Sequence, residues 1–152
     1  FLELRTIPGF HLLAENIEHR LGMISFYIDS VHYNLIVKLL NDRFGIQVRG
    51  GCSCAGTYGH YLLNLDQYTS KRITDKIDVG DNSERPGWVR MSIHPTTTDE
   101  ESDYMIEAIR EIQRNAQQWG ADYSYDTRNN EFIFKGTNGQ LQQRVEQWFS
   151  RG

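Results

Sequence analysis

Two cysteines in a glycine-rich segment are the residues of this chain with the clearest potential for chemistry. Cys52 and Cys54 follow the pair Gly50-Gly51, and Arg49 is the nearest fixed cation. A neighbouring positive charge lowers the pKa of a thiol, and the thiolate is the nucleophilic form. The segment is therefore compatible with a reactive cysteine. Spacing alone favours the simpler alternative, in which both cysteines are small residues packed under a loop.

The sequence gives less support to a disulfide, a metal site or a proton-transferring histidine. The two cysteines are one residue apart, so a disulfide between them would close a strained ring, and no second cysteine pair exists for a zinc site. His60 follows the cysteines closely and could exchange protons near neutral pH, but an isolated loop histidine is more often solvated. The remaining histidines have no ligand partner at a suitable spacing. No metal site is predicted.

The elements before the cysteines follow clear patterns. Residues 21–28 are mostly apolar, which predicts a strand buried on both faces. Residues 32–44 have apolar side chains at helical spacing, with Asp29 or Ser30 as the expected cap and Gly45 as the expected left-handed end. Residues 46–49 are then a brief strand that leads into the cysteine segment.

The region after the cysteines is irregular until about residue 86, with one short helix expected within residues 61–74. The alternation over residues 88–94 predicts a half-buried strand. Thr98 and Glu101 form a capping box for a helix that extends to Gly120.

The tail of the chain has the pattern of a hairpin followed by a helix. Tyrosines at 123 and 125 face phenylalanines at 132 and 134 across Asn129-Asn130, and a last helix is expected from about residue 139. The order of elements predicts an α+β fold, in which a small, largely antiparallel sheet has helices packed on one face. Residues 1–152 are expected to form a single domain, on which residues 119–152 pack as a C-terminal extension.

Composition excludes several classes of function. The net charge of −4 gives no overall attraction to nucleic acid, and no apolar run is long enough for a membrane span. The low cysteine content favours the cytoplasm. The chain opens on Phe1-Leu2-Glu3-Leu4 without an initiator methionine, so we expect a fragment of a longer polypeptide.

Several motifs together resemble class V aminotransferase-like enzymes of fold type I, which depend on pyridoxal 5'-phosphate (PLP). The SufS-type cysteine desulfurases and selenocysteine lyases are the most similar members. Their C-terminal small domain has an R-x-G-I-x-S-F strand and then G-I-A-V-R-x-G-x-x-C-A; the matching segments here are 20–26 and 45–55. A second match begins at Trp88-Val89-Arg90-Met91-Ser92 and continues at 99–101. The resemblance covers roughly residues 1–118.

The resemblance implies roles for three residues. Cys54 stands at the position of the desulfurase nucleophile, whose thiolate attacks the sulfur of the substrate and becomes a persulfide. Arg90 stands at the position of the arginine that binds the substrate carboxylate, a task suited to the fork of a guanidinium. Arg49 stands at the position of the arginine just before the cysteine loop. Cys52 and Ser53 occupy the places where those enzymes have two histidines.

The resemblance also implies what this chain lacks. The lysine that binds PLP belongs to a large domain in that family, and none of the four lysines here has its sequence context. The chain by itself is therefore expected to be inactive. The full-length enzyme is expected to be a homodimer acting on a small amino acid. The alternatives are another class V aminotransferase or lyase without cysteine catalysis, and a non-enzymatic α+β binding domain.

Overall fold

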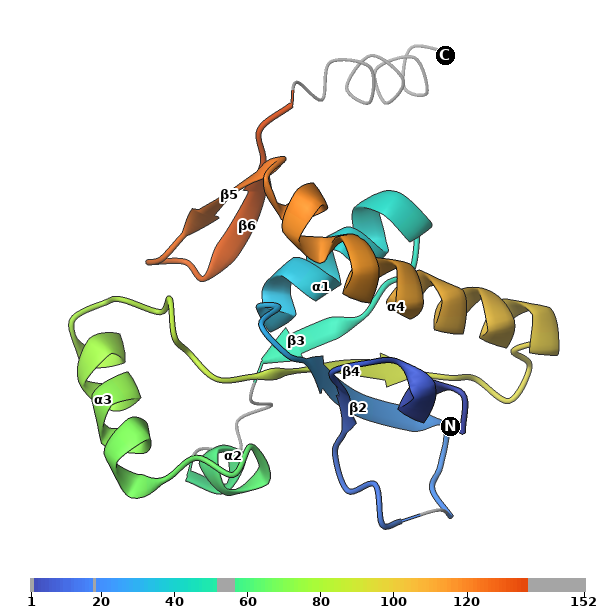
Figure 1. The fold of residues 1–152 in the computed structure, drawn as a ribbon, viewed down its shortest axis with the longest axis horizontal. Coiled ribbons are helices and arrows are strands. Elements are labelled where there is room, and N and C mark those ends of the chain that lie inside the picture. Colours follow the sequence, from blue (N-terminus) through green and yellow to red (C-terminus); the bar gives the residue numbers. More distant parts are fainter. Residues whose placement is uncertain (1, 18, 52–56, 137–152) are drawn as a thin grey trace, which may run out of the picture.

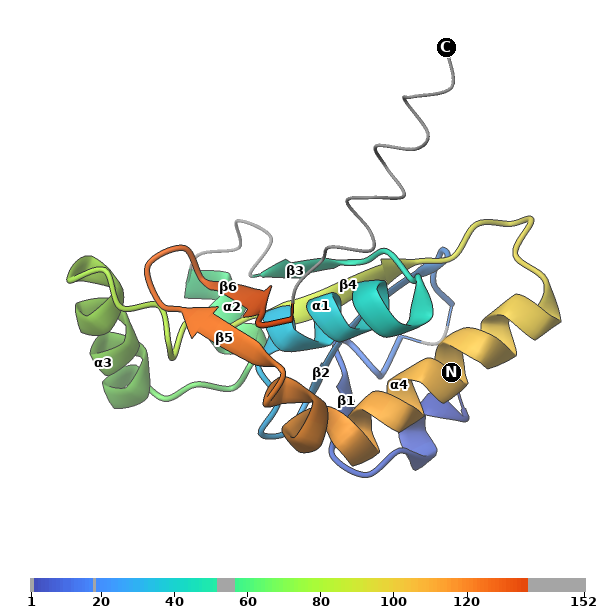
Figure 2. The same cartoon turned by 90° about the horizontal axis from the view of Figure 1, so that it is seen from above.

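A four-stranded antiparallel sheet forms the centre of the structure. The computed structural model describes residues 2–17, 19–51 and 57–136. The strands β1 (Phe10–Leu12), β2 (Met23–Ile28), β4 (Trp88–Ser92) and β3 (Arg49–Gly51) lie in the order β1-β2-β4-β3, and every neighbouring pair is antiparallel. The long helices α1 (Tyr33–Phe44) and α4 (Asp99–Gly120) lie on one side of this sheet (Figures 1 and 2). The predicted α+β class is confirmed.

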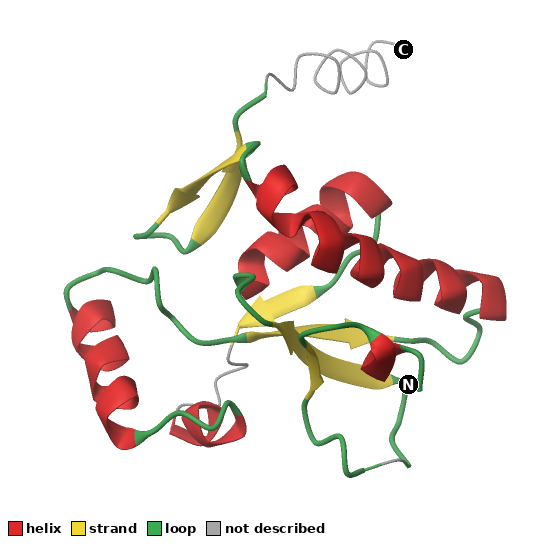
Figure 3. Cartoon of the chain, viewed as in Figure 1, coloured by secondary structure: helices red, strands yellow, loops and turns green. Residues whose placement is uncertain are grey.

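The remaining elements lie around this two-layer centre, and Figure 3 distinguishes them by type. They are the 3-10 helix Leu4–Thr6, α2 (Thr57–Leu62), α3 (Gln67–Asp78), and a separate two-stranded hairpin of β5 (Tyr123–Asp126) and β6 (Glu131–Phe134). Among the described residues, no helix is both long and apolar enough to cross a membrane.

The hydrophobic core fills the space between the sheet and the two long helices. Phe26 of β2 lies opposite Val89 of β4, and both are fully buried. Phe26 also stacks on Phe10 with the ring centroids 4.9 Å apart. The helices contribute the fully buried side chains Ile36, Leu39, Leu40, Ile109 and Ile112. Burying each such side chain contributes about 1.5–3 kcal/mol, so this layer is the main source of stability.

The prediction that β2 is buried on both faces is wrong. Its side chains alternate, with Ile24, Phe26 and Ile28 buried while Met23 remains 49% exposed. The reason is that α1 and α4 cover only one face, so the residues between the buried ones point to the other face.

Helix α1 begins at a cap that the sequence pattern did not indicate. His32 is the N-cap, and its Nδ1 accepts a hydrogen bond from the backbone N–H of Asn34 at 3.1 Å. The two expected N-caps, Asp29 and Ser30, do not cap the helix. The Asp29 carboxylate pairs with His11 at 2.9 Å, and Ser30 has a φ of 61°. Gly45 ends the helix with a φ of 66°, as predicted, since a left-handed C-cap favours glycine.

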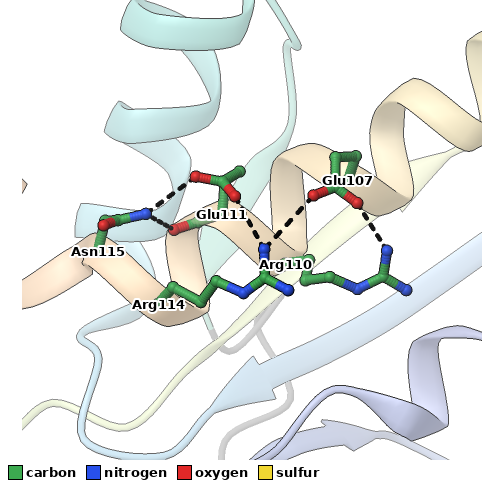
Figure 4. A network of polar contacts seen from close by, with 5 residues as sticks. All are labelled: Glu107, Arg110, Glu111, Arg114 and Asn115. Carbon is green, nitrogen blue, oxygen red and sulfur yellow. Dashed lines mark hydrogen bonds and ion pairs between the residues drawn. The ribbon is translucent and has the colours of Figure 1, made fainter.

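Helix α4 has the predicted capping box, in which Thr98 and Glu101 each accept a hydrogen bond from the other residue's backbone N–H. Its outer face has a chain of ion pairs (Figure 4). Arg110 binds Glu107 at 2.6 Å, and Arg114 binds Glu111 at 3.0 Å. Exposed pairs of this kind contribute only about 0.3–0.5 kcal/mol each, so they mark the solvent face of the helix rather than a site.

Two predictions around the cysteine segment need correction. Residues 46–48 are not a strand, because only Arg49–Gly51 pairs with β4. A single helix was expected within residues 61–74, but the structure has two. Helix α2 begins before residue 61, and α3 ends after residue 74. Asp66 caps α3 by accepting from the backbone N–H of Thr69 at 2.8 Å, a polar start signal that lies inside the predicted helix.

The predicted hairpin is confirmed, with Tyr123 opposite Phe134 and Tyr125 opposite Phe132. It is joined to the end of α1: the Tyr123 hydroxyl donates to Asp42 at 3.0 Å, and burial together with this carboxylate raises the pKa of Tyr123 to about 12. The predicted last helix from residue 139 lies outside the described residues.

The His32 cap of α1 should make the unfolding free energy depend on pH. Burial lowers the pKa of His32 from its usual 6.5. The folded state therefore favours the neutral ring, whose Nδ1 can accept, and the unfolded state binds the proton more tightly. The unfolding free energy is expected to be highest above pH 6.5 and to fall as the pH drops through the folded pKa. Loss of the cap alone should cost about 1 kcal/mol.

Urea unfolding between pH 7.5 and pH 5 measures this change. His32→Asn is the matched control, because asparagine caps helices without titrating in this range. The variant should lose less stability than the wild type over the same interval. Parallel pH curves for the two proteins would contradict the assignment.

Candidate functional site

The face of the sheet opposite α1 and α4 brings the two predicted arginines together. In the strand register, Ser25 of β2 lies opposite Arg90 of β4, and Arg90 lies opposite Arg49 of β3. The next row on this face contains Trp88 of β4 opposite Gly51 of β3. Because neighbouring strands are less than about 5 Å apart, the three residues Ser25, Arg90 and Arg49 form one continuous row across the sheet.

The two arginines lie side by side without an acidic partner among the described residues. Like charges directly opposite each other in a sheet are destabilising. Within the described ranges, no acidic side chain forms an ion pair with Arg49 or Arg90. Arg49 is exposed and Arg90 is half-buried. Such a pair is suited to bind a carboxylate or another small anion, which would remove the repulsion.

An open cleft of about 510 Å³ lies beside both arginines. It is lined by Gln47, Val48, Arg49, Arg90 and Ser92. Its polar side chains can donate hydrogen bonds, and its volume admits a small amino acid.

A second cleft on the same side of the sheet is apolar. It has a volume of about 440 Å³ and lies between the segment that connects β1 to β2 and helix α2; its lining includes Ile17, Leu21, Met23, Tyr58, Leu62 and Trp88. Leu21 is 91% exposed and Met23 is 49% exposed. The open face therefore combines an exposed apolar surface with two arginines that form no ion pair within the described ranges.

Of the predicted site residues, the structure describes the two arginines but not the two cysteines. Arg49 and Arg90 are brought together at the start of β3, whereas Cys54, the predicted nucleophile, and Cys52 lie outside the described residues. The described chain stops at Gly51 and resumes at Thr57, the first residue of α2. His60 is part of α2.

Sequence reasoning gave no role to Ser25 and Ser92, which share the open face with the arginines. Ser25 lies beside Arg90, and Ser92 lines the cleft. Strand alternation was the available signal, because Ser25 is flanked by Ile24 and Phe26, which are buried on the opposite face.

The lysines of this chain do not fit a role as the covalent anchor for PLP. Lys71 pairs with Asp75 at 3.3 Å, Lys76 pairs with Glu84 at 2.5 Å, and the Lys135 ammonium donates to a backbone carbonyl at 2.8 Å. Lys38 lies on α1, 3.9 Å from Asp42. None of them lines the cleft at the arginines. Among the described residues, no cluster of histidine, cysteine and acidic side chains could hold a metal ion.

Comparison with known proteins identifies the class and then the family. The fold and its open face define an α+β domain that presents two adjacent arginines beside an apolar surface. The family profile described as aminotransferase class V matches residues 2–105. The chain therefore belongs to the class V aminotransferase family, and the resemblance found in the sequence motifs is confirmed at this level. The match ends before the hairpin.

One solved structure that resembles the chain is the cysteine desulfurase CsdA (S-sulfonic acid) from Escherichia coli. The sequences are 20% identical, the match covers 74% of this chain and 22% of that enzyme, and the TM-score is 0.46. The chain thus spans about a fifth of the length of that structure. No curated protein sequence matches the chain.

The arginine pair should be visible in the stability of the chain. Replacing Arg90 by glutamine removes the repulsion from Arg49 and is expected to raise the unfolding free energy by about 0.5 kcal/mol at low ionic strength. The gain should fade in about 1 M salt, where the Debye length is about 3 Å. Urea unfolding at both salt concentrations measures it. Arg114→Gln is the control, because it removes ion pairs with Glu107 and Glu111 and should not stabilise the chain. A destabilised Arg90→Gln chain at low salt would show that Arg90 has a structural partner.

Proposed function

We propose that this chain is the small domain of a class V PLP enzyme that acts as a cysteine desulfurase or selenocysteine lyase. The observation that carries the proposal is the pairing of Arg49 with Arg90 on the open face, directly before the cysteine segment. The family membership supports the cofactor class. The motif around Cys54, with a nucleophile position two residues after Cys52, supports the sulfur chemistry rather than a transamination.

Arg90 binds the α-carboxylate of the amino-acid substrate in this proposal. It lies on the central part of the sheet, between β2 and β3, so its backbone is held on both sides. A guanidinium can donate two parallel hydrogen bonds to a carboxylate, which fixes both the position and the orientation of the substrate. Arg49 adds a second positive charge to the same cleft.

The thiolate of Cys54 forms an S–S bond with the sulfur of the substrate while the Cβ–S bond of the substrate breaks. The electron pair of that bond and a proton remain on the carbon skeleton, which leaves as alanine, and a reductant later releases the persulfide sulfur as sulfide. The positive charge of Arg49 near the start of the segment favours the thiolate form of the acceptor. Because Arg49 and Arg90 lie opposite each other, the cleft that binds the substrate adjoins the strand that leads into the cysteine segment.

The PLP cofactor and the residues that anchor it belong, in this proposal, to a large domain in the full-length protein. The lysines of this chain are engaged at its surface or lie away from the cleft. The open face is the surface that such a domain would cover, because its apolar side chains and its two arginines are both available. The small domain alone is then inactive.

Replacing Cys54 by alanine in the full-length enzyme is expected to reduce sulfide release from L-cysteine on the order of a thousandfold or more, since the acceptor of the sulfur is lost. Sulfide production in the presence of a reductant measures it. Cys52→Ala is the matched control and should keep most of the activity. Undiminished turnover by Cys54→Ala would overturn the assignment of the nucleophile, and transamination without sulfide release would overturn the desulfurase reaction.

Replacing Arg90 by lysine tests the carboxylate site. Lysine keeps the charge but loses the bidentate geometry, at a cost of about 1.5–3 kcal/mol for hydrogen bonds to a charged group. We expect kcat/KM for cysteine to fall about tenfold to a hundredfold, mainly through KM. Steady-state kinetics measures the change, with the exposed Arg114→Lys as control. An unchanged KM would show that another residue binds the carboxylate.

A further inference from the structure

An open cleft of about 310 Å³ lies at the end of the sheet where β2 leads into α1. Four segments border it: the end of β2, the start of α1, the connection between α2 and α3, and the connection between α3 and β4. It shares no lining residue with the cleft at Arg49 and Arg90. We call it the His32 cleft, because His32 contributes a polar side chain to its lining.

The His32 ring has one nitrogen without a hydrogen-bond partner. Nδ1 accepts from the backbone N–H of Asn34 at 3.1 Å, so the proton of the neutral ring is on Nε2. Burial lowers the pKa of His32 below its usual 6.5, so the ring is neutral at pH 7.5. Nε2 is shielded from solvent and forms no hydrogen bond within the described part of the chain. A buried donor without an acceptor is costly, and such groups are rare in folded proteins. An acceptor placed in the cleft would complete this donor.

Three aromatic rings hold the His32 ring in one orientation. It stacks on Tyr33 with the ring centroids 4.6 Å apart, and it lies 5.1 Å from the ring of Tyr125 and 5.4 Å from the ring of Phe132. The donor is therefore fixed before any ligand arrives. A fixed donor favours binding, because little side-chain freedom is lost when the hydrogen bond forms.

Two charged side chains line the cleft, and they differ in their partners. The Glu84 carboxylate is compensated: Oε1 accepts from Lys76 at 2.5 Å, and Oε2, which forms no hydrogen bond, lies 2.8 Å from Nη1 of Arg72. Arg85 donates from Nη1 to Oδ1 of Asn82 at 3.2 Å, and no acidic side chain in the described ranges forms an ion pair with it. A guanidinium has further N–H donors, so Arg85 can bind an anion.

The rest of the lining is largely apolar and can pack against hydrocarbon. Each of its four bordering segments contributes to this wall or lies next to it. The wall consists of Ile28, Val31, Leu63, Leu65 and Pro86. Small-molecule sites commonly combine such a wall with a few placed polar groups that fix the orientation of the ligand.

We propose that the His32 cleft binds a small carboxylate with an apolar body, of the aryl or branched alkyl class. The carboxylate accepts from Nε2–H of His32 and from the Arg85 guanidinium, and the apolar body packs on the wall. Two donors select an anionic acceptor, while the compensated charge of Glu84 does not repel it. The proposal does not rest on the proposed function, because the cleft and the arginine site have no residue in common.

The test titrates phenylacetate into the full-length protein at pH 7.5 and follows the methyl groups of isoleucine, leucine and valine by NMR. Methyl signals of Val31, Leu63 and Leu65 should shift in a saturable way, with a dissociation constant on the order of 1 mM. Phenylacetamide lacks the charge and acetate lacks the apolar body. Both should bind at least about tenfold more weakly.

Three variants locate the carboxylate. His32→Asn keeps the helix cap and removes the Nε2–H donor, and Arg85→Gln removes the guanidinium. Each should weaken phenylacetate binding on the order of tenfold, because a hydrogen bond to a charged group is lost. Arg90→Gln is the matched control. It removes the other arginine that could bind a carboxylate, so the shifts at Val31, Leu63 and Leu65 should persist in it.

The possible outcomes either support the proposal or overturn it. Absence of saturable shifts at these methyl groups would overturn it and would leave water as the partner of Nε2. Equal affinities for phenylacetamide and phenylacetate would overturn the carboxylate class, and loss of the shifts in Arg90→Gln would move the ligand to the arginine cleft. If His32→Asn does not fold, Arg85→Gln decides, because Arg85 is exposed and its replacement leaves the core intact.

Discussion

The packing of α1 and α4 against a single face of the four-stranded sheet is the interaction on which the other features depend. It buries the side chains of Phe26 and Val89 completely and holds β2 and β4 in one register. Because strand residues alternate between faces, the same register directs Ser25, Arg90 and Arg49 to the opposite, open face. The core thus builds the candidate site indirectly: the residues that give stability decide which residues remain available for chemistry.

The repulsion between Arg49 and Arg90, which lie opposite each other in the sheet, is destabilising. The sheet keeps them together without an acidic partner among the described residues, although their repulsion disfavours the arrangement. Sites that bind an anion commonly hold such charges in place, because the ligand supplies the missing partner. The neighbouring apolar cleft adds a surface that a larger protein can cover. Both observations support the proposed function, in which another part of a class V enzyme would complete the site.

The second network of the structure is polar and lies at the edge of the core. Tyr33 packs on two glycines, and Asn130 and Asn82 attach the hairpin to α1 and to the α3–β4 connection. The buried side-chain amide of Asn82 donates to the carbonyls of Thr127 and Arg128, and its oxygen accepts from Arg85 at 3.2 Å. This makes the contact specific, since an unmatched buried amide would cost about 1–3 kcal/mol. The hairpin is therefore joined by directional hydrogen bonds to the part of the fold that matches the family profile.

The features that could be predicted from the sequence are those that depend on neighbouring residues. The capping box at Thr98, the left-handed Gly45 and the hairpin pattern across Asn129-Asn130 are local, and all three are confirmed. The motifs around Arg49 and Arg90 identified the family for the same reason. One prediction from neighbouring residues was wrong. Asp29 and Ser30 are residue types that commonly cap helices, but the turn before α1 places His32 at the N-cap.

The tertiary structure alone decided what depends on contacts between distant segments. The sequence established that the chain has two arginines in class V motifs, but the strand register placed them opposite each other on an open face. It indicated a hairpin, but the contact of Asn130 with Tyr33, 97 residues away, followed only from the packing. The physical reason is that helix caps, turns and alternation are set within a few residues, whereas register and side-chain networks depend on how whole elements pack.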